Sequence, residues 1–450
     1  MDLQGKKVLT IGAGLSGFAT CQFLLAHGAK VTLSDAKSKE QLGADINQFA
    51  NHGVELLLSN LMPSVADWDL CIKSPGVPPT IPLVEMVKAA GIEMISEIEL
   101  AYLFAASPII AITGTNGKTT TTALTGYILS QAGINTLVGG NIGTPLIEHI
   151  ENYQGMVVAE VSSFQLEDCY EFKPHIAAML NISPDHQDRH GSMAVYQQVK
   201  ERIFARQDRN DLAILNYDDD VCRGIGEKLS QRTVFFSTSQ LVNGGIYLDN
   251  GQIILDDNGH KINIISVKDI YIKGHHNWQN AMAAAAAAYY SGVAADDIAN
   301  ALHSFPGVEH RMEFVCERNG ISFVNDSKGT NPDSTQKALL SYQRPLILIA
   351  GGRNKGNDFA PLMGLIKDKV RKLIILGEAT DDIRRAADNA GFKDYILAGG
   401  FDEAVRSACQ TAQRGDLVLL SPACASWDMF KNYEERGNRF KQIVKDYGEE

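Results

Sequence analysis

The sequence lacks the features that usually mark a secreted or membrane-embedded protein. Its seven cysteines are isolated and odd in number, and none forms a Cys-x-x-Cys pair. This pattern argues against a disulfide framework or a thiolate zinc site and favours a reducing compartment. No uninterrupted apolar run reaches the roughly 18 residues of a membrane-spanning helix, and the first apolar segment runs at once into glycines, unlike a signal peptide. We therefore expect a cytoplasmic protein without membrane insertion.

Basic residues are fewer than acidic ones. Lysine and arginine number 41 against 53 aspartates and glutamates, which gives a net charge of −12. This balance argues against nucleic acid or an acidic membrane surface as the main partner. An anionic ligand would have to be met by locally placed lysines, arginines and backbone N–H groups.

The most informative segment is the glycine-rich stretch 114–120, which reads Gly-Thr-Asn-Gly-Lys-Thr-Thr. β-Prone apolar residues precede it, and a helix-like segment follows. In that order the loop amides and the helix N-terminus point donors at an anion. Lys118 would reach the β- and γ-phosphates of a nucleotide, and Thr119 could ligate Mg²⁺. Ile112 stands where the usual pattern has glycine, and an ordinary turn is the alternative interpretation.

A second glycine-rich turn, Gly12–Gly17, follows the first strand-like segment, and Asp35 ends the next one. This arrangement is typical of a dinucleotide site, with a helix N-terminus for the pyrophosphate and an acid for a ribose hydroxyl. Any nucleotide diphosphate satisfies the same physics, and the turn Ser74–Gly76 could help close the pocket. The alternatives are glycines that only allow a helix to pack on a sheet, and an NAD-dependent oxidoreductase.

The chain is long enough for about three domains at roughly 150 residues each. Strand-like and helix-like segments alternate at both ends, which predicts parallel sheets. Between about 232 and 273 the apolar period changes to two, and Asn250-Gly251 predicts a hairpin. We expect an α/β protein with a Rossmann-like domain at 1–96 and a P-loop ATPase-like domain with an antiparallel insert at 97–306. A Rossmann-like domain at 307–450 would follow a hinge at Pro306–Gly307.

Several polar residues should lie at the carboxyl edge of the P-loop sheet. Glu160 ends a strand-like run where a second Mg²⁺ ligand belongs, although such a glutamate can also be solvated or capping. Asp185-His186 follows another strand onto the same rim. Lys200 lies in a helical pattern, and its alternative role is that of a solvated lysine. Arg311 could neutralise transferred phosphate charge or form an interdomain salt bridge.

Taken in order, these segments resemble the Mur ligases over essentially the whole chain. The absent first glycine also fits, because that family uses Gly-Thr-x-Gly-Lys-Thr. The stretches that carry the similarity are Gly114–Thr120, Glu160–Leu166, Asn181–His186, Gly274–Asn277, His310–Glu313, Asn325–Lys328 and Ser421–Asp428.

The resemblance implies an ATP-dependent amide ligase that adds D-glutamate to UDP-N-acetylmuramoyl-L-alanine through an acyl phosphate, in peptidoglycan precursor synthesis. It implies a monomer that uses Mg²⁺ and a CO₂-derived carbamate on Lys200. For ATP the implied residues are Gly114, Thr115, Asn116, Gly117, Lys118, Thr119, Thr120, Asn277, Asn280, Arg311 and Asp326. For the UDP substrate they are Leu15, Ser16, Asp35, Gly76, Asn141, Asp185 and His186.

For the metal, the resemblance implies Thr119, Glu160, His186 and carbamylated Lys200. Lys118, Lys200, His186, Glu160 and Arg311 would be catalytic. For D-glutamate it implies Thr330, Lys355, Ser426 and Tyr433. Tyr433 and Trp427 depart from the family pattern, which often has phenylalanine and a smaller apolar residue there, and this bears on the affinity for the amino acid.

Overall fold

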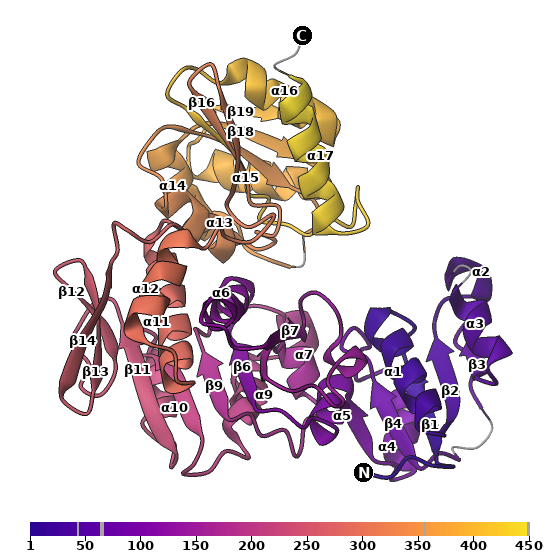
Figure 1. The fold of residues 1–450 in the computed structure, drawn as a ribbon. Coiled ribbons are helices and arrows are strands. Elements are labelled where there is room, and N and C mark those ends of the chain that lie inside the picture. The colour runs from indigo at the N-terminus through magenta and orange to yellow at the C-terminus, as the bar shows by residue number, and fades with distance from the viewer. Residues whose placement is uncertain (43–44, 64–66, 355, 448–450) are drawn as a thin grey trace. The chain divides into compact units, whose positions relative to one another are not determined.

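The computed structural model describes residues 1–42, 45–63, 67–354 and 356–447 (Figure 1). The chain divides into two compact units. The first comprises Met1–Asp269 and Gln279–His303, and the second Ile270–Trp278 and Ser304–Glu450. Within the described ranges, no helix combines the length and apolar character needed to cross a membrane.

The first unit begins with a parallel sheet that has five strands in the described ranges, in the order β3-β2-β1-β4-β5. Its strand order, with β1 at the centre and parallel neighbours on both sides, is that of a doubly wound fold. The strands are β1 (Lys7–Ile11), β2 (Lys30–Asp35), β3 (Glu55–Leu58), β4 (Leu70–Lys73) and β5 (Met94–Ser96). The helices are α1 (Leu15–Ala26), α2 (Lys39–Leu42), α3 (Asp45–Asn51) and α4 (Pro82–Ala89).

The second sheet of this unit has nine strands among the described residues, in the order β14-β13-β12-β11-β10-β9-β6-β8-β7. Its strands from β6 to β12 pair in parallel, whereas β12, β13 and β14 are antiparallel. The strands are β6 (Ile109–Thr113), β7 (Thr136–Gly140), β8 (Met156–Glu160), β9 (Ile176–Met179), β10 (Leu212–Asn216), β11 (Arg232–Ser237), β12 (Ile246–Asp249), β13 (Gln252–Asp257) and β14 (His260–Ser266).

Buried helices pack around this second sheet and join it to the first. Residues of both sheets, such as Leu33 and Val157, belong to one hydrophobic cluster. The helical segments are α5 (Glu97–Leu103), α6 (Lys118–Gln131), η1 (Leu146–Glu148), α7 (Ser163–Leu166), α8 (Gln187–His190), α9 (Met193–Glu201), η2 (Arg202–Phe204), α10 (Asp220–Gly226), α11 (His275–Tyr290) and α12 (Ala295–Ser304).

The second unit contains a sheet with six strands in the part of the chain that the structure describes, ordered β15-β16-β20-β17-β18-β19. Among the described strand pairs of this sheet, only β15–β16 is antiparallel. The strands are β15 (Glu313–Arg318), β16 (Ile321–Asn325), β17 (Leu346–Gly351), β18 (Val370–Leu376), β19 (Tyr395–Leu397) and β20 (Leu417–Leu420). The helices are α13 (Pro332–Leu340), α14 (Ala360–Lys369), α15 (Thr380–Asn389), α16 (Phe401–Thr411) and α17 (Tyr433–Asp446).

The predicted α/β class with an antiparallel insert is confirmed. Asp249 pairs with Gln252 across the expected hairpin, and its turn residues have positive φ, 48° at Asn250 and 79° at Gly251. This is the geometry of a two-residue type I′ turn, which the Asn-Gly pair favours. The boundaries at 96 and 306 stay predictions, because one compact unit comprises Met1–Asp269 and Gln279–His303 and so spans the first boundary without a division.

Candidate active site

The P-loop joins β6 to α6 and depends on two glycines with positive φ, 147° at Gly114 and 87° at Gly117. A Cβ atom on Gly117 would lie 2.4 Å from Oδ1 of Asn280, so the loop passes close to that side chain. Lys118 begins the helix, and its Nζ atom donates to the carbonyl oxygens of Gly114 and Thr115, at 2.8 Å each. The lysine therefore curls over its own loop, as a phosphate cradle requires.

The loop is held by the segment that follows β9 and by Tyr196 of α9. The Thr115 hydroxyl donates to the Ser183 carbonyl at 3.1 Å and lies 3.1 Å from the Tyr196 hydroxyl. The Asn116 amide donates to Oδ1 of Asn181 at 2.9 Å, and Nδ2 of Asn181 returns a bond to the Asn116 carbonyl at 3.0 Å. Neither Asn181 nor Tyr196 had a predicted role, although Asn181 opens the stretch Asn181–His186 that carries part of the family resemblance.

Glu160 lies beside the P-loop strand, because β8 pairs with β6 in the register that sets Glu160 opposite Ile112. Its side chain is 1% exposed, so the solvated interpretation is wrong. Oε1 accepts from Nδ2 of Asn141 at 2.7 Å, whereas the buried Oε2 accepts no hydrogen bond from any described residue. A buried carboxylate oxygen of this kind fits a divalent cation, which prefers oxygen ligands.

His186 begins the short helix α8 with a positive φ of 49°. Its ring meets the Phe164 ring at a centroid distance of 4.7 Å, and Nε2 lies 3.6 Å from Oδ2 of Asp185. An imidazole oriented in this way by an aromatic ring and a carboxylate can serve as a metal ligand or hydrogen-bond partner.

Lys200 is 1% exposed and points from α9 into the P-loop. Its Nζ atom donates to the Gly114 carbonyl at 2.8 Å and to Oγ1 of Thr113 at 3.2 Å. Burial holds the pKa of Lys200 well below 10.5 and the Lys118 charge lowers it further, while Asp185 and Glu160 act in the opposite direction. The solvated-lysine interpretation is therefore wrong, and the P-loop, Glu160, Asp185 and Lys200 share one neighbourhood.

The turn after β1 confirms that its glycines have a packing role. A Cβ atom on Gly17 would lie 1.8 Å from the Gly12 carbonyl, which also accepts from the Ser74 hydroxyl at 3.2 Å. Oδ2 of Asp35 accepts from the Ala13 amide at 2.7 Å, and the same carboxylate accepts from the Lys37 amide at 2.8 Å. The packing does not compete with ligand binding, because it holds the helix N-terminus in the geometry that a diphosphate needs.

Three other residues predicted to contact the UDP group lie at this turn and at the turn after β4. Leu15 is 77% exposed, Ser16 is half-buried, and Gly76 is exposed. All three are accessible to a ligand. Asp35 differs from them, because its carboxylate already accepts hydrogen bonds from the Ala13 and Lys37 amides.

In the second unit, Arg311 pairs with a buried carboxylate. Its Nη1 atom lies 3.7 Å from Oδ1 of Asp326, which is 1% exposed and accepts from the Ser421 hydroxyl at 2.8 Å. Burial raises the pKa of Asp326, although Arg311 and Ser421 lower it. The ion-pair partner of Arg311 thus belongs to its own unit. Asn277 lies in this unit as well, and Asn280 lies in the first.

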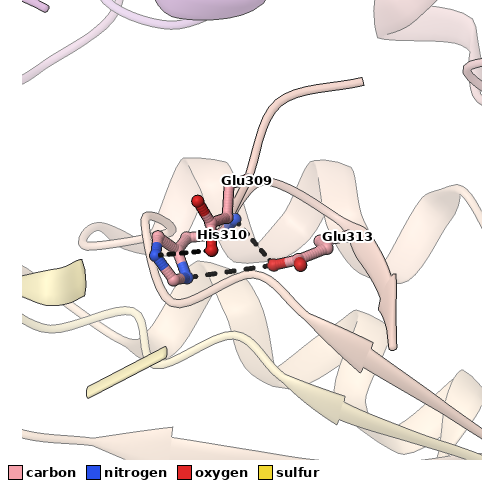
Figure 2. A group of neighbouring side chains, drawn as sticks. All are labelled: Glu309, His310 and Glu313. Carbon is pink, nitrogen blue, oxygen red and sulfur yellow. Dashed lines mark hydrogen bonds and ion pairs between the residues drawn. The ribbon is translucent and has the colours of Figure 1, made fainter. Parts of the chain in front are cut away.

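Arg311 lies between members of a compact acidic cluster, which Figure 2 shows. Side-chain atoms of Glu309, His310 and Glu313 that could ligate a metal lie within 4.8 Å of one another. The Lys441 ammonium already pairs with both carboxylates, at 3.1 Å from Oε1 of Glu313 and in a hydrogen bond to Glu309. We therefore interpret the cluster as an ion-pair network that holds the loop leading to Arg311.

Three of the four residues predicted to bind D-glutamate lie on loops that hydrogen bonds hold together. The Ser327 hydroxyl donates to the Tyr433 carbonyl at 2.8 Å, and the Ala423 amide donates to the Gly329 carbonyl at 2.9 Å. These bonds bring together the segments of Thr330, Ser426 and Tyr433. Lys355 lies outside the described residues. Trp427, which departs from the family pattern, is 60% exposed.

Comparison with known proteins finds three domain models along the chain. The model of the Mur ligase MurD-like N-terminal domain matches residues 6–96, that of the Mur ligase middle domain matches 112–288, and that of the Mur ligase glutamate ligase domain matches 310–424. The fold is also similar to a pseudomurein peptide ligase type C from Methanothermus fervidus. That likeness has a TM-score of 0.63 at 20% identity, over 98% of this chain and 100% of that one.

Two curated relatives match nearly the full length. The UDP-N-acetylmuramoylalanine–D-glutamate ligase of Pelotomaculum thermopropionicum is 47% identical over 447 residues, with 98% of each chain covered. The ligase of the same name from Thermoanaerobacter pseudethanolicus is 45% identical over 449 residues, with 99% of each chain covered. From the matched domains and these relatives, we conclude that the chain belongs to the Mur ligase family.

Proposed function

We propose that this protein joins D-glutamate to UDP-N-acetylmuramoyl-L-alanine at the expense of ATP, in the synthesis of a peptidoglycan precursor. The names of the two full-length relatives support this reaction. The structural observation that carries it is the P-loop with Lys118 curled over it, beside the buried Glu160 and Lys200. The oxidoreductase alternative has no support, since the turn at Gly12–Gly17 belongs to a ligase and any nucleotide diphosphate fits it.

We assign the UDP group to residues 1–96, ATP to 97–306 and the amino acid to 307–450. The accessible positions of Leu15 and Ser16 at the first turn, and of Gly76 at the turn after β4, support the UDP assignment. The loops of Thr330, Ser426 and Tyr433 support the amino-acid assignment. We further propose that the protein acts in the cytoplasm as a monomer.

The proposed chemistry starts from a carboxylate, which is a poor acyl donor because its leaving group would be oxide. Transfer of the γ-phosphoryl group of ATP to this carboxylate makes an acyl phosphate and ADP. Lys118, and Arg311 from the amino-acid unit, would offset the charge of the moving phosphoryl group. The D-glutamate amine then attacks the acyl carbon, and the tetrahedral intermediate releases phosphate and leaves an amide.

The residues around the P-loop fit a divalent cation. The buried Oε2 of Glu160 supports this role most directly, and we assign Thr119, His186 and Lys200 to the same site. Bound Mg²⁺ would supply charge neutralisation at the phosphates. Lys200 would contribute after its neutral amine adds to CO₂ and loses a proton, which turns a cation into a carboxylate-like oxygen ligand. Its lowered pKa supports that step, because only the unprotonated amine is nucleophilic.

ADP release tests the proposed function. The protein is mixed with ATP, Mg²⁺, UDP-N-acetylmuramoyl-L-alanine and each of a panel of L- and D-amino acids. We expect ADP and amide to form together with D-glutamate and not with L-glutamate. Release with an L-amino acid alone, or release that does not require the UDP substrate, would overturn the assignment.

A further inference from the structure

Arg189 joins two parts of the first unit that the sequence places far apart. It lies in α8, three residues after His186, and its guanidinium carbon sits 4.0 Å from the centroid of the Phe164 ring. The His186 ring contacts the same Phe164 ring at 4.7 Å. Arg189 and His186 therefore pack on the same aromatic ring.

On its other side, Arg189 reaches the first sheet. Its Nη1 atom donates to the Pro75 carbonyl at 2.7 Å, one residue before Gly76. Nε and Nη2 donate to the two oxygens of Glu167 at 2.9 and 2.6 Å. The planar fork of arginine makes this bidentate bond and the third bond at once, and a lysine ammonium cannot reproduce that geometry.

Lys73 completes the connection from beneath the turn Ser74–Gly76. It is 1% exposed, and its Nζ atom lies 3.3 Å from Oε2 of Glu167 and 3.1 Å from Oδ2 of Asp168. Glu167 thus bridges Lys73 and Arg189. Burial tends to raise the pKa of Glu167, but the two cations lower it overall, so the glutamate stays charged. Movement of the turn would separate these buried charges and leave them unpaired. Because unpaired buried charges are costly, the ion pairs hold the turn in place.

We propose that Arg189 is a positioning residue that fixes the distance between the turn Pro75–Gly76 and the His186 segment. The inference rests on the proposed function, in which these segments hold the UDP end and the reacting end of one substrate. The fixed distance selects nucleotide-linked acids of one length, because both ends must reach their loops together. Arg189 bonds to Pro75 and Glu167 rather than to the P-loop, so its displacement would reach ATP only through His186. We therefore expect a smaller effect on ATP than on the UDP substrate, both ends of which depend on these segments.

The test compares Arg189→Lys with Arg206→Lys as a matched control. Arg206 is exposed and pairs with Glu171 and the Tyr170 carbonyl, away from both loops. We expect Arg189→Lys to raise the KM for UDP-N-acetylmuramoyl-L-alanine by about tenfold or more, since small misplacements of bound groups are costly. The KM for ATP should rise clearly less, the thermal midpoint should change little, and Arg206→Lys should change none of the three quantities.

Other outcomes would overturn the inference. One is an unchanged KM for the UDP substrate. The other is an equal rise in both KM values together with a lower thermal midpoint, because that result indicates only a general structural role. Failure of the proposed function is distinguishable, because the unaltered protein would then release no ADP. If Arg189→Lys does not fold, Glu167→Gln removes the bridging charge with little change of shape, and the same selective rise in KM is expected.

Discussion

The Nζ atom of Lys200 lies 2.8 Å from the carbonyl oxygen of Gly114, a residue 86 positions earlier in the chain. This bond fastens α9 to the first residue of the P-loop. Lys118 donates to the same carbonyl oxygen at 2.8 Å. Two lysines therefore converge on one backbone acceptor, and their mutual repulsion disfavours the protonated form of the buried one. The charge state of Lys200 and the shape of the phosphate loop are coupled by this arrangement.

Removal of the Lys118 ammonium should abolish both halves of the reaction. We expect Lys118→Ala to lower ADP release and amide formation by about 10²–10³-fold or more, because the charge of the phosphoryl group would lose its nearest cation. Lys173→Ala serves as the control, since Lys173 forms a surface ion pair with Asp208. Substantial ligation by the Lys118 variant would refute the role assigned to this lysine.

An added carboxylic acid should replace the missing group of a Lys200 variant. We expect Lys200→Ala to be nearly inactive and to regain activity in acetate or formate, whose oxygens can occupy the space of a carbamate. Chloride at equal ionic strength controls for salt. If the carboxylic acids restore nothing above the chloride level, Lys200 has only a structural role.

Burial of Lys200 should lower the free energy of unfolding of the protein at neutral pH. Its pKa in the folded protein lies below the value of 10.5 for an exposed lysine, so the unfolded chain binds more protons. This contribution lowers the free energy of unfolding as the pH falls below 10.5. Lys200→Met removes it, and we expect a thermal midpoint at pH 7 that is higher by about 2 °C or more, with ligase activity lost. A lower midpoint would contradict this account.

The turn after β1 should tolerate a methyl group at one glycine and not at another. A Cβ atom on Gly17 would lie 1.8 Å from the Gly12 carbonyl, whereas one on Gly14 would meet nothing within 4 Å. We expect Gly17→Ala to lower the free energy of unfolding by about 1–3 kcal/mol and to raise the KM for the UDP substrate. Gly14→Ala should cost well under 1 kcal/mol in the same urea titration. Equal losses in the two variants would show that the close contact is relieved elsewhere.

The ion pairs of Lys441 should support the loop that carries Arg311. In Lys441→Ala the carboxylates of Glu309 and Glu313 would face each other beside His310 without a counter-charge (Figure 2). We expect a loss of about 1 kcal/mol in the free energy of unfolding and a higher KM for ATP, because Arg311 would be held less firmly. Lys445→Ala, one turn later on the same helix and exposed, is the control. An unchanged KM for ATP would show that the Lys441 ion pairs do not affect ATP binding.

Local patterns in the sequence were sufficient for part of the site. The run Ile109–Thr113 and the glycines after it specify a strand and a loop through nearest-neighbour geometry, and Asn250-Gly251 specifies its hairpin in the same way. The burial of Lys200 could not be predicted like this. Its helix offers both a solvated and a buried face, and only the packing of α9 against the P-loop decides between them.

Long-range pairing accounts for most of what the sequence did not reveal. Nothing near Arg189 indicates that its guanidinium bonds to Pro75, 114 positions away. The same applies to Asn181, whose side chain holds the P-loop from the segment after β9. Strand order is equally non-local, since β8 and β9 flank β6 although β7 precedes both of them in the chain.

The order of the third sheet has a consequence for how the protein is made. Its last strand, β20, lies between β16 and β17 and hydrogen-bonds to both. Until Leu417–Leu420 leaves the ribosome, the earlier strands exist as a two-stranded ribbon and a separate group of three, neither of which has its central neighbour. The sheet can therefore close only when synthesis is almost complete, so translation that stops before Leu417 yields chains whose final sheet cannot assemble.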